Sequence, residues 1–205
     1  DRGFVFVSVN YRFIPQVTIE EMAGDIAKAI RWTHDHASEF NASTSSIHVL
    51  GHSAGAHLAA LVSTDDSYLK AEGLPLQTIK SCVPVDTAAY DVHKQVASVS
   101  TLRGTLYRTA FGQDANNQSR RSPIAHVATN KGIPPFLILH VADRADSKAQ
   151  SVAFAKALSD SGVDAKVVAA EGKTHGTIST DLGKPDDVPT KAVFAFLTRD
   201  RDTSF

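Results

Sequence analysis

The chain has 205 residues, of which 42% are hydrophobic and 21% are charged, and this is the composition of an ordinary globular domain. Its formal net charge of -1 provides no attraction to nucleic acid or to an anionic membrane, so we expect neither as a partner. No apolar run approaches the roughly 18 residues that cross a membrane. The single cysteine, Cys82, excludes an internal disulfide.

Apolar runs and helical periods alternate along the chain. The first run, residues 4–10, has the pattern of a strand and comes almost at once after a start without methionine, so we expect that an upstream segment is missing. Thr18 and Glu21 form a capping box that opens a helix with Met22 and Ile26 on its buried stripe. Later strands are predicted at 47–50, 79–85, 136–141 and 165–170, and later helices at 54–63, 147–161 and 189–197.

Strands and helices that alternate, with strands apolar on both faces, predict the α/β class. We therefore expect one domain over residues 1–205, with a mostly parallel sheet covered by helices on both faces. The polar stretch at about 91–131 is too long for an ordinary connection between two strands. Because insertions at the carboxyl end of such a sheet face the ligand crevice, this stretch is predicted to be a small lid.

The pentapeptide Gly51-His52-Ser53-Ala54-Gly55 lies between an apolar strand and an alanine-rich helix. This setting predicts a nucleophile elbow, a sharp strand–turn–helix bend that exposes the serine hydroxyl. We expect a Cβ atom at either glycine to collide with neighbouring backbone. The amide of Ala54, at the start of the helix, is a candidate oxyanion donor. Ser53 is therefore the candidate nucleophile.

A serine nucleophile needs a base, and His175 is the best candidate. It lies in a glycine-flanked loop directly after the strand predicted at 165–170. His140 lies within an apolar strand, and we expect it to be a hydrogen-bonded core residue. His57 is expected on the buried side of the elbow helix. No histidine cluster has the spacing of a zinc site, so neither a metal nor another cofactor is expected.

The third group of the triad is expected just after the strand at 136–141, where Asp143 and Asp146 are candidates. Asp146 has a possible structural role, because it precedes Ser147, which has a glutamine three residues later and so predicts a second capping box. Asp143 has no such role and is favoured. Asp86, after the strand at 79–85, is a third possibility, since some enzymes place the acid one strand earlier.

With these motifs in order, the chain resembles the carboxyl-terminal two-thirds to three-quarters of an α/β-hydrolase of the esterase and arylformamidase group. The resemblance rests on these motifs: Val9-Asn10-Tyr11-Arg12, residues 51–59, Ser122-Pro123-Ile124, residues 134–137 and residues 172–176. It implies the fold, a triad of Ser53, His175 and an acid within 143–146, and hydrolysis of small carboxylic esters. Members of this group carry a His-Gly-Gly turn upstream that supplies a second oxyanion donor, and this sequence contains no such turn.

The predicted function is therefore that of a serine hydrolase whose partner is a small ester. Cleavage of an N-formyl amide, as in an arylformamidase, would use the same triad, and a catalytically inactive hydrolase-fold domain that binds a ligand is the alternative from another class. His52 and Tyr90 are predicted to contact the substrate. Tyr107 and Phe111 are further candidates for the rim of its pocket.

Overall fold

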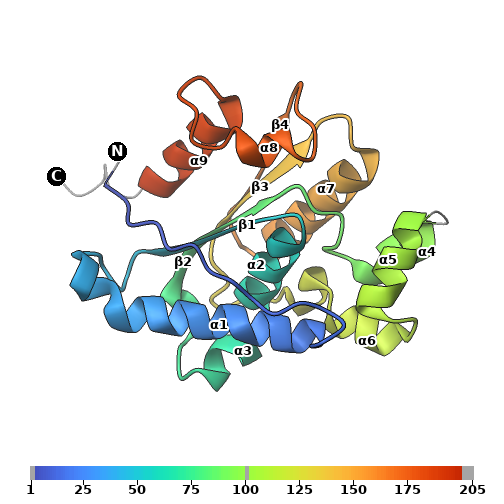
Figure 1. Cartoon of the computed structure of the whole chain (residues 1–205), viewed down its shortest axis with the longest axis horizontal. Coiled ribbons are helices and arrows are strands. Elements are labelled where there is room, and N and C mark those ends of the chain that lie inside the picture. Colours follow the sequence, from blue (N-terminus) through green and yellow to red (C-terminus); the bar gives the residue numbers. More distant parts are fainter. Residues whose placement is uncertain (1–2, 100–101, 200–205) are drawn as a thin grey trace.

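The computed structural model describes residues 3–99 and 102–199, and its centre is a parallel four-stranded sheet (Figure 1). The strands lie side by side in chain order: β1 (Ile47–His52), β2 (Ile79–Val85), β3 (Phe136–Val141) and β4 (Ala165–Ala170). Leu50 pairs with Val83, and Val85 with Leu139, so the carboxyl ends of neighbouring strands meet at one edge. This confirms the predicted parallel sheet.

Helices cover both faces of the sheet, as predicted. On one face α2 (Ala54–Thr64) lies against β1 and β2, α1 (Ile19–His36) packs on α2, and α7 (Ala145–Asp160) covers β3 and β4. On the other face α9 (Val188–Thr198) contacts β3 and β4, next to the short α8 (Thr177–Thr180) (Figure 1). The remaining described helices are η1 (Ala37–Phe40), α3 (Asp66–Ala71), η2 (Leu76–Thr78), α4 (Val92–Ser98), α5 (Leu102–Phe111), α6 (Ala115–Arg120) and η3 (Pro123–His126).

Each face of the sheet has its own hydrophobic core because side chains alternate along a strand. Phe136 and Ile138 point into the larger core with α1, α2 and α7, whereas Leu137 and Leu139 point into the smaller core beneath α9. All four side chains are almost fully buried. The two cores together hold the strand ends in place, and the candidate site lies at those ends.

The first turns of two helices test the predicted capping boxes. Thr18 caps α1 as predicted, with its hydroxyl accepting from the Glu21 amide and the Glu21 carboxylate accepting from the Thr18 amide. The second capping box is wrong. The helix α7 begins at Ala145, before Ser147, and the hydroxyl of Ser147 donates instead to the carboxylate of Asp86. The Ser147 hydroxyl thus bonds to a buried carboxylate in place of the predicted capping bond to the backbone of its own helix.

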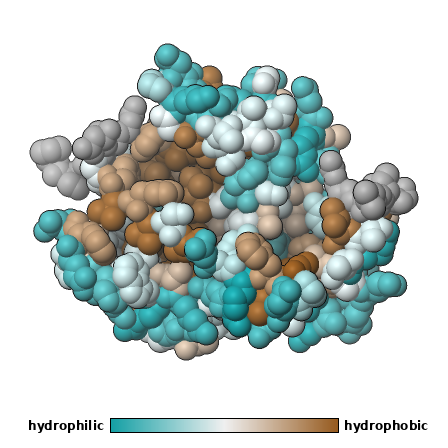
Figure 2. Space-filling model, in the orientation of Figure 1, coloured by the Kyte–Doolittle hydropathy of each residue, from teal (hydrophilic) through white to brown (hydrophobic). Residues whose placement is uncertain are grey.

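The run at 4–10 does not form the predicted strand. It has no regular secondary structure and lies outside the sheet, and the ring of Phe4 lies 6.0 Å from that of His48 and 6.1 Å from that of Phe194. Phe6 remains 85% exposed, and Leu50 on β1 is 45% exposed. Figure 2 shows hydrophobic side chains gathered on the side of the molecule where this segment crosses the sheet. A strand requires a neighbouring strand for its amides and carbonyls, and residues 5–9 make no backbone–backbone hydrogen bond with another described residue.

The predicted insertion contains α4, α5 and α6, which lie together at one end of the molecule (Figure 1), and η3, which packs against α2. Arg121, directly after α6, forms two hydrogen bonds with the Glu20 carboxylate on α1, at 2.8 and 3.0 Å. Its carbonyl oxygen lies 2.7 Å from Nε2 of His57 on α2. The insertion is thus attached to both α1 and the elbow helix. In the part of the chain that the structure describes, every helix is too short or insufficiently apolar to span a membrane.

Candidate active site

The elbow has the strained geometry that its sequence predicts. Ser53 has a φ of 58° and a ψ of -116°, in a region that non-glycine residues rarely adopt, and it joins β1 directly to α2. A Cβ atom on Gly51 would lie 2.2 Å from the carbonyl oxygen of Gly55, so glycine is required there. The expectation for Gly55 is wrong: a Cβ atom on it would meet nothing within 4 Å.

Three side chains from distant parts of the sequence form a hydrogen-bonded chain. Nε2 of His175 lies 2.9 Å from Oγ of Ser53, and Nδ1 lies 2.6 Å from Oδ2 of Asp86. Ser53 follows β1, Asp86 follows β2, and His175 lies in the loop between β4 and α8. Because parallel strands end at the same edge of the sheet, this edge brings the three groups together. The arrangement has the connectivity of a Ser-His-Asp triad.

Asp86 is fully buried and is held by several donors. Its Oδ1 accepts from the Val141 amide at 3.1 Å and from the Ser147 hydroxyl at 2.7 Å, and its Oδ2 faces Nη1 of Arg144 at 2.5 Å. Burial alone would raise the pKa of Asp86. The hydrogen bonds from His175, Ser147 and the Val141 amide, together with the charge of Arg144, lower that pKa below its usual value. Asp86 is therefore ionised at neutral pH.

The carboxylate against His175 is thus Asp86, and not the favoured Asp143. Asp143 is exposed in the turn after β3, where the Arg144 amide donates to the carbonyl of Val141 and directs the chain into α7. The alternative acid, Asp146, lies in the first turn of α7 and contacts Nη2 of Arg144 at 3.4 Å. In this turn the guanidinium of Arg144, and neither carboxylate, contacts the imidazole, while the preceding strand supplies the carboxylate through Asp86.

Arg144 is a member of the site that the sequence did not indicate. Its Nη1 contacts Asp86 Oδ2 and also lies 2.8 Å from Nδ1 of His175. Its guanidinium therefore lies beside the Asp86–His175 pair, with Asp146 on its other side. Its position between the two candidate acids, Asp143 and Asp146, is the signal in the sequence that could have drawn attention to it.

His52 lies against the loop that carries His175. Its Nε2 lies 2.8 Å from the carbonyl oxygen of His175, and the two imidazole rings are 4.5 Å apart. Burial lowers the pKa of His52, and the charge of His175 adds to this effect. A carbonyl oxygen only accepts, so Nε2 of His52 carries a proton and donates it to the His175 carbonyl. This nitrogen is therefore engaged by the protein and not free for the predicted contact with substrate.

The aromatic residues predicted at a pocket rim lie largely in the core. Tyr90 is fully buried, with its ring stacked on Phe154 at 4.5 Å, and burial raises its pKa well above the usual value. Phe111 is also buried and contacts the ring of His57 edge-on at 5.0 Å. Tyr107 is partly buried and stacks on Phe111 at 6.1 Å. Large apolar rings such as these gain more from burial in the core than from exposure at a substrate pocket.

The histidines assigned to the core are there. His57 is buried on α2, and burial lowers its pKa to about 4. His140 is buried in β3, with Nδ1 2.9 Å from the carbonyl oxygen of Val141. Within residues 3–99 and 102–199, no group of three His, Cys, Asp or Glu side chains could hold a metal ion.

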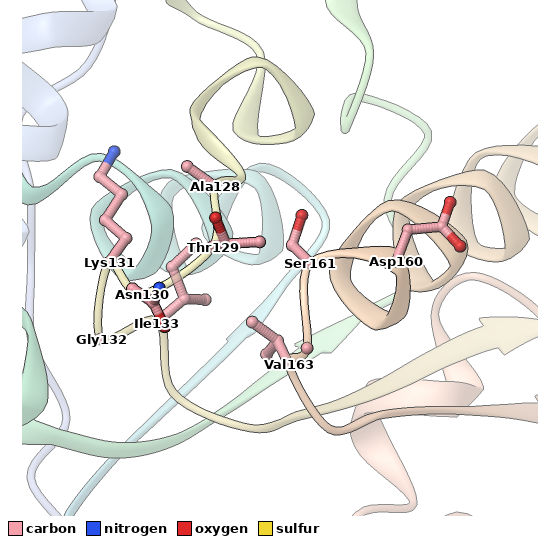
Figure 3. A pocket seen from close by; sticks show the side chains of 10 residues that line it. Ala128, Thr129, Asn130, Lys131, Gly132, Ile133, Asp160, Ser161 and Val163 are labelled. Carbon is pink, nitrogen blue, oxygen red and sulfur yellow. The ribbon is translucent and has the colours of Figure 1, made fainter.

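Ala54 begins α2 immediately after the nucleophile, and it is exposed. As the first helical residue, it has an amide without an acceptor inside its own helix. A cavity of about 480 Å³ lies elsewhere, lined by residues 128–133 and 160–163 (Figure 3). These segments precede β3 and β4, so this cavity lies at the amino ends of the strands, at the edge of the sheet opposite the triad.

The parallel sheet, the elbow and the Ser53–His175–Asp86 chain define the α/β-hydrolase class, with the architecture of its carboxylesterase-like members. The chain belongs to the BD-FAE family, whose family model matches residues 1–158. The match includes the elbow and Asp86 and ends before His175.

Two similar proteins are named as esterases. The chain is 28% identical over 206 residues to the probable isoprenylcysteine alpha-carbonyl methylesterase ICMEL1 of Arabidopsis thaliana, covering 89% of this chain and 40% of that protein. It is 30% identical over 169 residues to esterase LipQ of Mycobacterium tuberculosis, covering 78% of this chain and 39% of the relative. The chain therefore spans about two-fifths of the length of these relatives.

Solved structures share the fold. Native esterase 2 of the planctomycete Thermogutta terrifontis superposes with a TM-score of 0.69 at 22% identity, covering 93% of this chain and 69% of that one. A truncated carbohydrate esterase from gut microbiota superposes with a TM-score of 0.73 at 20% identity, covering 95% and 73%. At these identities the likeness concerns the fold alone.

Proposed function

We propose that this chain is a serine hydrolase that cleaves small carboxylic esters through Ser53, His175 and Asp86. One observation carries the proposal: Nε2 of His175 lies 2.9 Å from Oγ of Ser53 while Nδ1 lies 2.6 Å from a buried carboxylate. A serine hydroxyl is a weak nucleophile until a positioned base accepts its proton. Here the base is within hydrogen-bonding distance and has its own orienting partner.

These contacts determine which nitrogen of His175 carries the proton. Asp86 is ionised and accepts only, so Nδ1 carries a proton that it donates to Oδ2, Arg144 donates to the same carboxylate and not to Nδ1, and Nε2 presents its lone pair to Ser53. When Oγ attacks the ester carbonyl, its proton moves to Nε2, and Asp86 stabilises the imidazolium. The same proton then passes to the departing alcohol. Water, activated by the imidazole in the same way, hydrolyses the acyl-enzyme.

The negative oxygen of the tetrahedral intermediate requires donors that are already oriented. The amide of Ala54 suits this role, since it follows the nucleophile and lies at the amino end of α2, where the helix dipole favours negative charge. One such donor contributes roughly 100- to 1,000-fold to turnover. The reaction needs no cofactor beyond these groups.

The substrate class rests on the accessibility of the site and on the relatives. His175 is 44% exposed at its side chain, so a small ester reaches the imidazole without passing through a closed channel. The names of ICMEL1 and LipQ, a methylesterase and an esterase, support ester hydrolysis by this chain. Cleavage of an N-formyl amide would use the same three groups, and a direct assay separates the two activities.

A fluorophosphonate probe tests the proposal, because it modifies a serine only where a base activates it. We expect mass spectrometry to find the label on Ser53, and turnover of p-nitrophenyl acetate to exceed that of N-formylkynurenine. The substitution Ser53→Ala removes the nucleophile and should lower kcat at least about 1,000-fold while the protein stays folded.

The control is the circular dichroism spectrum of the same Ser53→Ala preparation, which should match that of the parent chain. Hydrolysis that persists in this variant would remove Ser53 from the mechanism. A folded parent chain that neither reacts with the probe nor turns over ester would instead favour the binding domain.

A further inference from the structure

The loop that carries His175 is exposed, yet its imidazole must meet two fixed partners. Gly172 allows the entry to this loop with a φ of 66°. Inside the loop, the Thr174 amide donates to the Thr177 hydroxyl at 2.8 Å, and the Thr177 amide donates to the Thr174 hydroxyl at 3.1 Å. These bonds determine the shape of the turn, but they do not locate it relative to Ser53 and Asp86.

Lys173 provides a connection from this loop to the rest of the protein. Its ammonium group lies 2.8 Å from Oδ2 of Asp181, which follows α8, and 2.6 Å from Oδ1 of Asp187, which precedes α9. Asp187 is almost fully buried, with a side chain that is 2% exposed. Its other oxygen caps α9 by accepting from the Thr190 amide at 2.8 Å and from the Thr190 hydroxyl at 2.7 Å.

Asp187, the buried partner of Lys173, is attached to a well-packed helix. The helix α9 packs into the smaller core through Val193 and Phe196, directly against β3 and β4. A buried carboxylate is costly unless it is paired, and the ammonium group of Lys173 is the cation beside Asp187. His52, which lies on β1, also contacts the loop through the carbonyl of His175. Lys173 and His52 thus connect the loop to two separate elements of the protein.

We propose that Lys173 is a positioning residue for the reaction: it holds the His175 loop where the imidazole reaches Ser53 and Asp86 together. The proposal rests on the proposed esterase function and extends it to a residue that touches no reacting atom. A displacement of about 1 Å in a reacting group can reduce turnover by about 100-fold. The effect should therefore fall on kcat and leave substrate binding nearly unchanged.

The test compares Lys173→Met with a control that removes a similar charge. Lys184 pairs with the same Asp181 through an ammonium group whose side chain is 65% exposed, and it meets Asp187 only through its backbone carbonyl, which the substitution Lys184→Met leaves in place, so Lys184→Met is that control. We expect Lys173→Met to lower kcat for p-nitrophenyl acetate about 100-fold, with KM changed less than about threefold. Lys184→Met should retain the kcat of the parent chain, and Lys173→Arg should recover part of the loss because it restores the cation.

A second measurement is independent of activity: hydrogen exchange of the amides at 172–178 should accelerate in Lys173→Met and stay unchanged in Lys184→Met. If Lys173→Met fails to fold, Lys173→Gln takes its place in both measurements. Unchanged exchange and unchanged kcat in a folded Lys173 variant would overturn the proposal, as would equal losses in the Lys184 variant. If the parent chain itself lacks esterase activity, the proposed function fails, and the exchange data alone then decide whether Lys173 anchors the loop.

Discussion

Backbone strain is concentrated at two residues of the site. Ser53 and Asp86 both have positive φ values, 58° and 51°, although neither is glycine, and they directly follow the neighbouring strands β1 and β2. Such conformations cost of order 1 to 3 kcal/mol each and persist only where the surrounding structure imposes them. The Val141 amide and the Ser147 hydroxyl hold Asp86, while the Ser53 amide donates to the carbonyl of Val85 on the neighbouring strand. The strain turns both side chains toward the same imidazole.

Two matched substitutions test which aspartate is the acid. Asp86→Asn keeps the size of the side chain but removes its charge and favours the wrong tautomer of His175. We expect kcat for p-nitrophenyl acetate to fall roughly 1,000- to 10,000-fold. Asp143→Asn, in an exposed turn, should leave kcat within about twofold because surface substitutions seldom act beyond their own contacts.

Steady-state kinetics on both variants, with thermal melting to verify folding, provide the comparison. The opposite ranking would mean that Asp143 reaches the imidazole during turnover. A large loss in both variants would indicate that the two carboxylates act through one shared network.

At the scale of elements, the segment at 4–10 differs most from its prediction. Its sequence has the apolar and β-branched residues of a strand, but a strand requires a partner for its amides and carbonyls. Residues 5–9 make no backbone hydrogen bond to any other part of the described chain. By contrast, β3 is paired on both sides, by β2 and by β4.

Hydrogen exchange should report this difference directly. We expect the amides of residues 5–9 to exchange near the rate of an unprotected peptide, and those of 136–141 to exchange only on global opening. The control is the α1 helix, whose amides at 22–30 should be intermediate or slow. Strong protection at 5–9 would show that this segment pairs with a strand in solution.

At the scale of the whole molecule, His57 links the elbow helix to the insertion and makes stability depend on pH. Its Nε2–H donates to the Arg121 carbonyl, and burial lowers its pKa to about 4 from an ordinary 6.5. Below about pH 6.5 the His57 imidazole therefore binds a proton in the unfolded chain but stays neutral in the folded chain until about pH 4. Stability falls as the pH decreases from about 6.5 to about 4, by about 3 kcal/mol from this residue.

The variant His57→Gln keeps a donor for Arg121 and does not titrate. Urea unfolding at pH 7 and at pH 4 should show that the parent chain loses about 3 kcal/mol more than the variant over this range. All other titrating groups are common to the two proteins, so they cancel in the comparison. An identical pH dependence in both would mean that His57 is solvated or already charged in the folded state.

The class of fold and the elbow could be predicted from the sequence because both depend on local patterns. Apolar strands that alternate with helices determined the layered architecture, and glycine two residues before Ser53 is required by a contact within the turn itself. The candidate base His175 was also found from the sequence, since a glycine-flanked loop after a strand is a local feature.

The tertiary structure alone decided which carboxylate meets that base. Asp86, Asp143 and Asp146 all follow strands, and the sequence cannot state which of them the sheet edge presents to a loop about 30 to 90 residues further on. The same holds for Ser147, whose hydroxyl bonds to Asp86 from within α7 and does not cap the helix, and for residues 5–9, which pair with no strand among the described residues. Each of these outcomes depends on distances between segments far apart in the chain, and such distances exist only after the sheet has assembled.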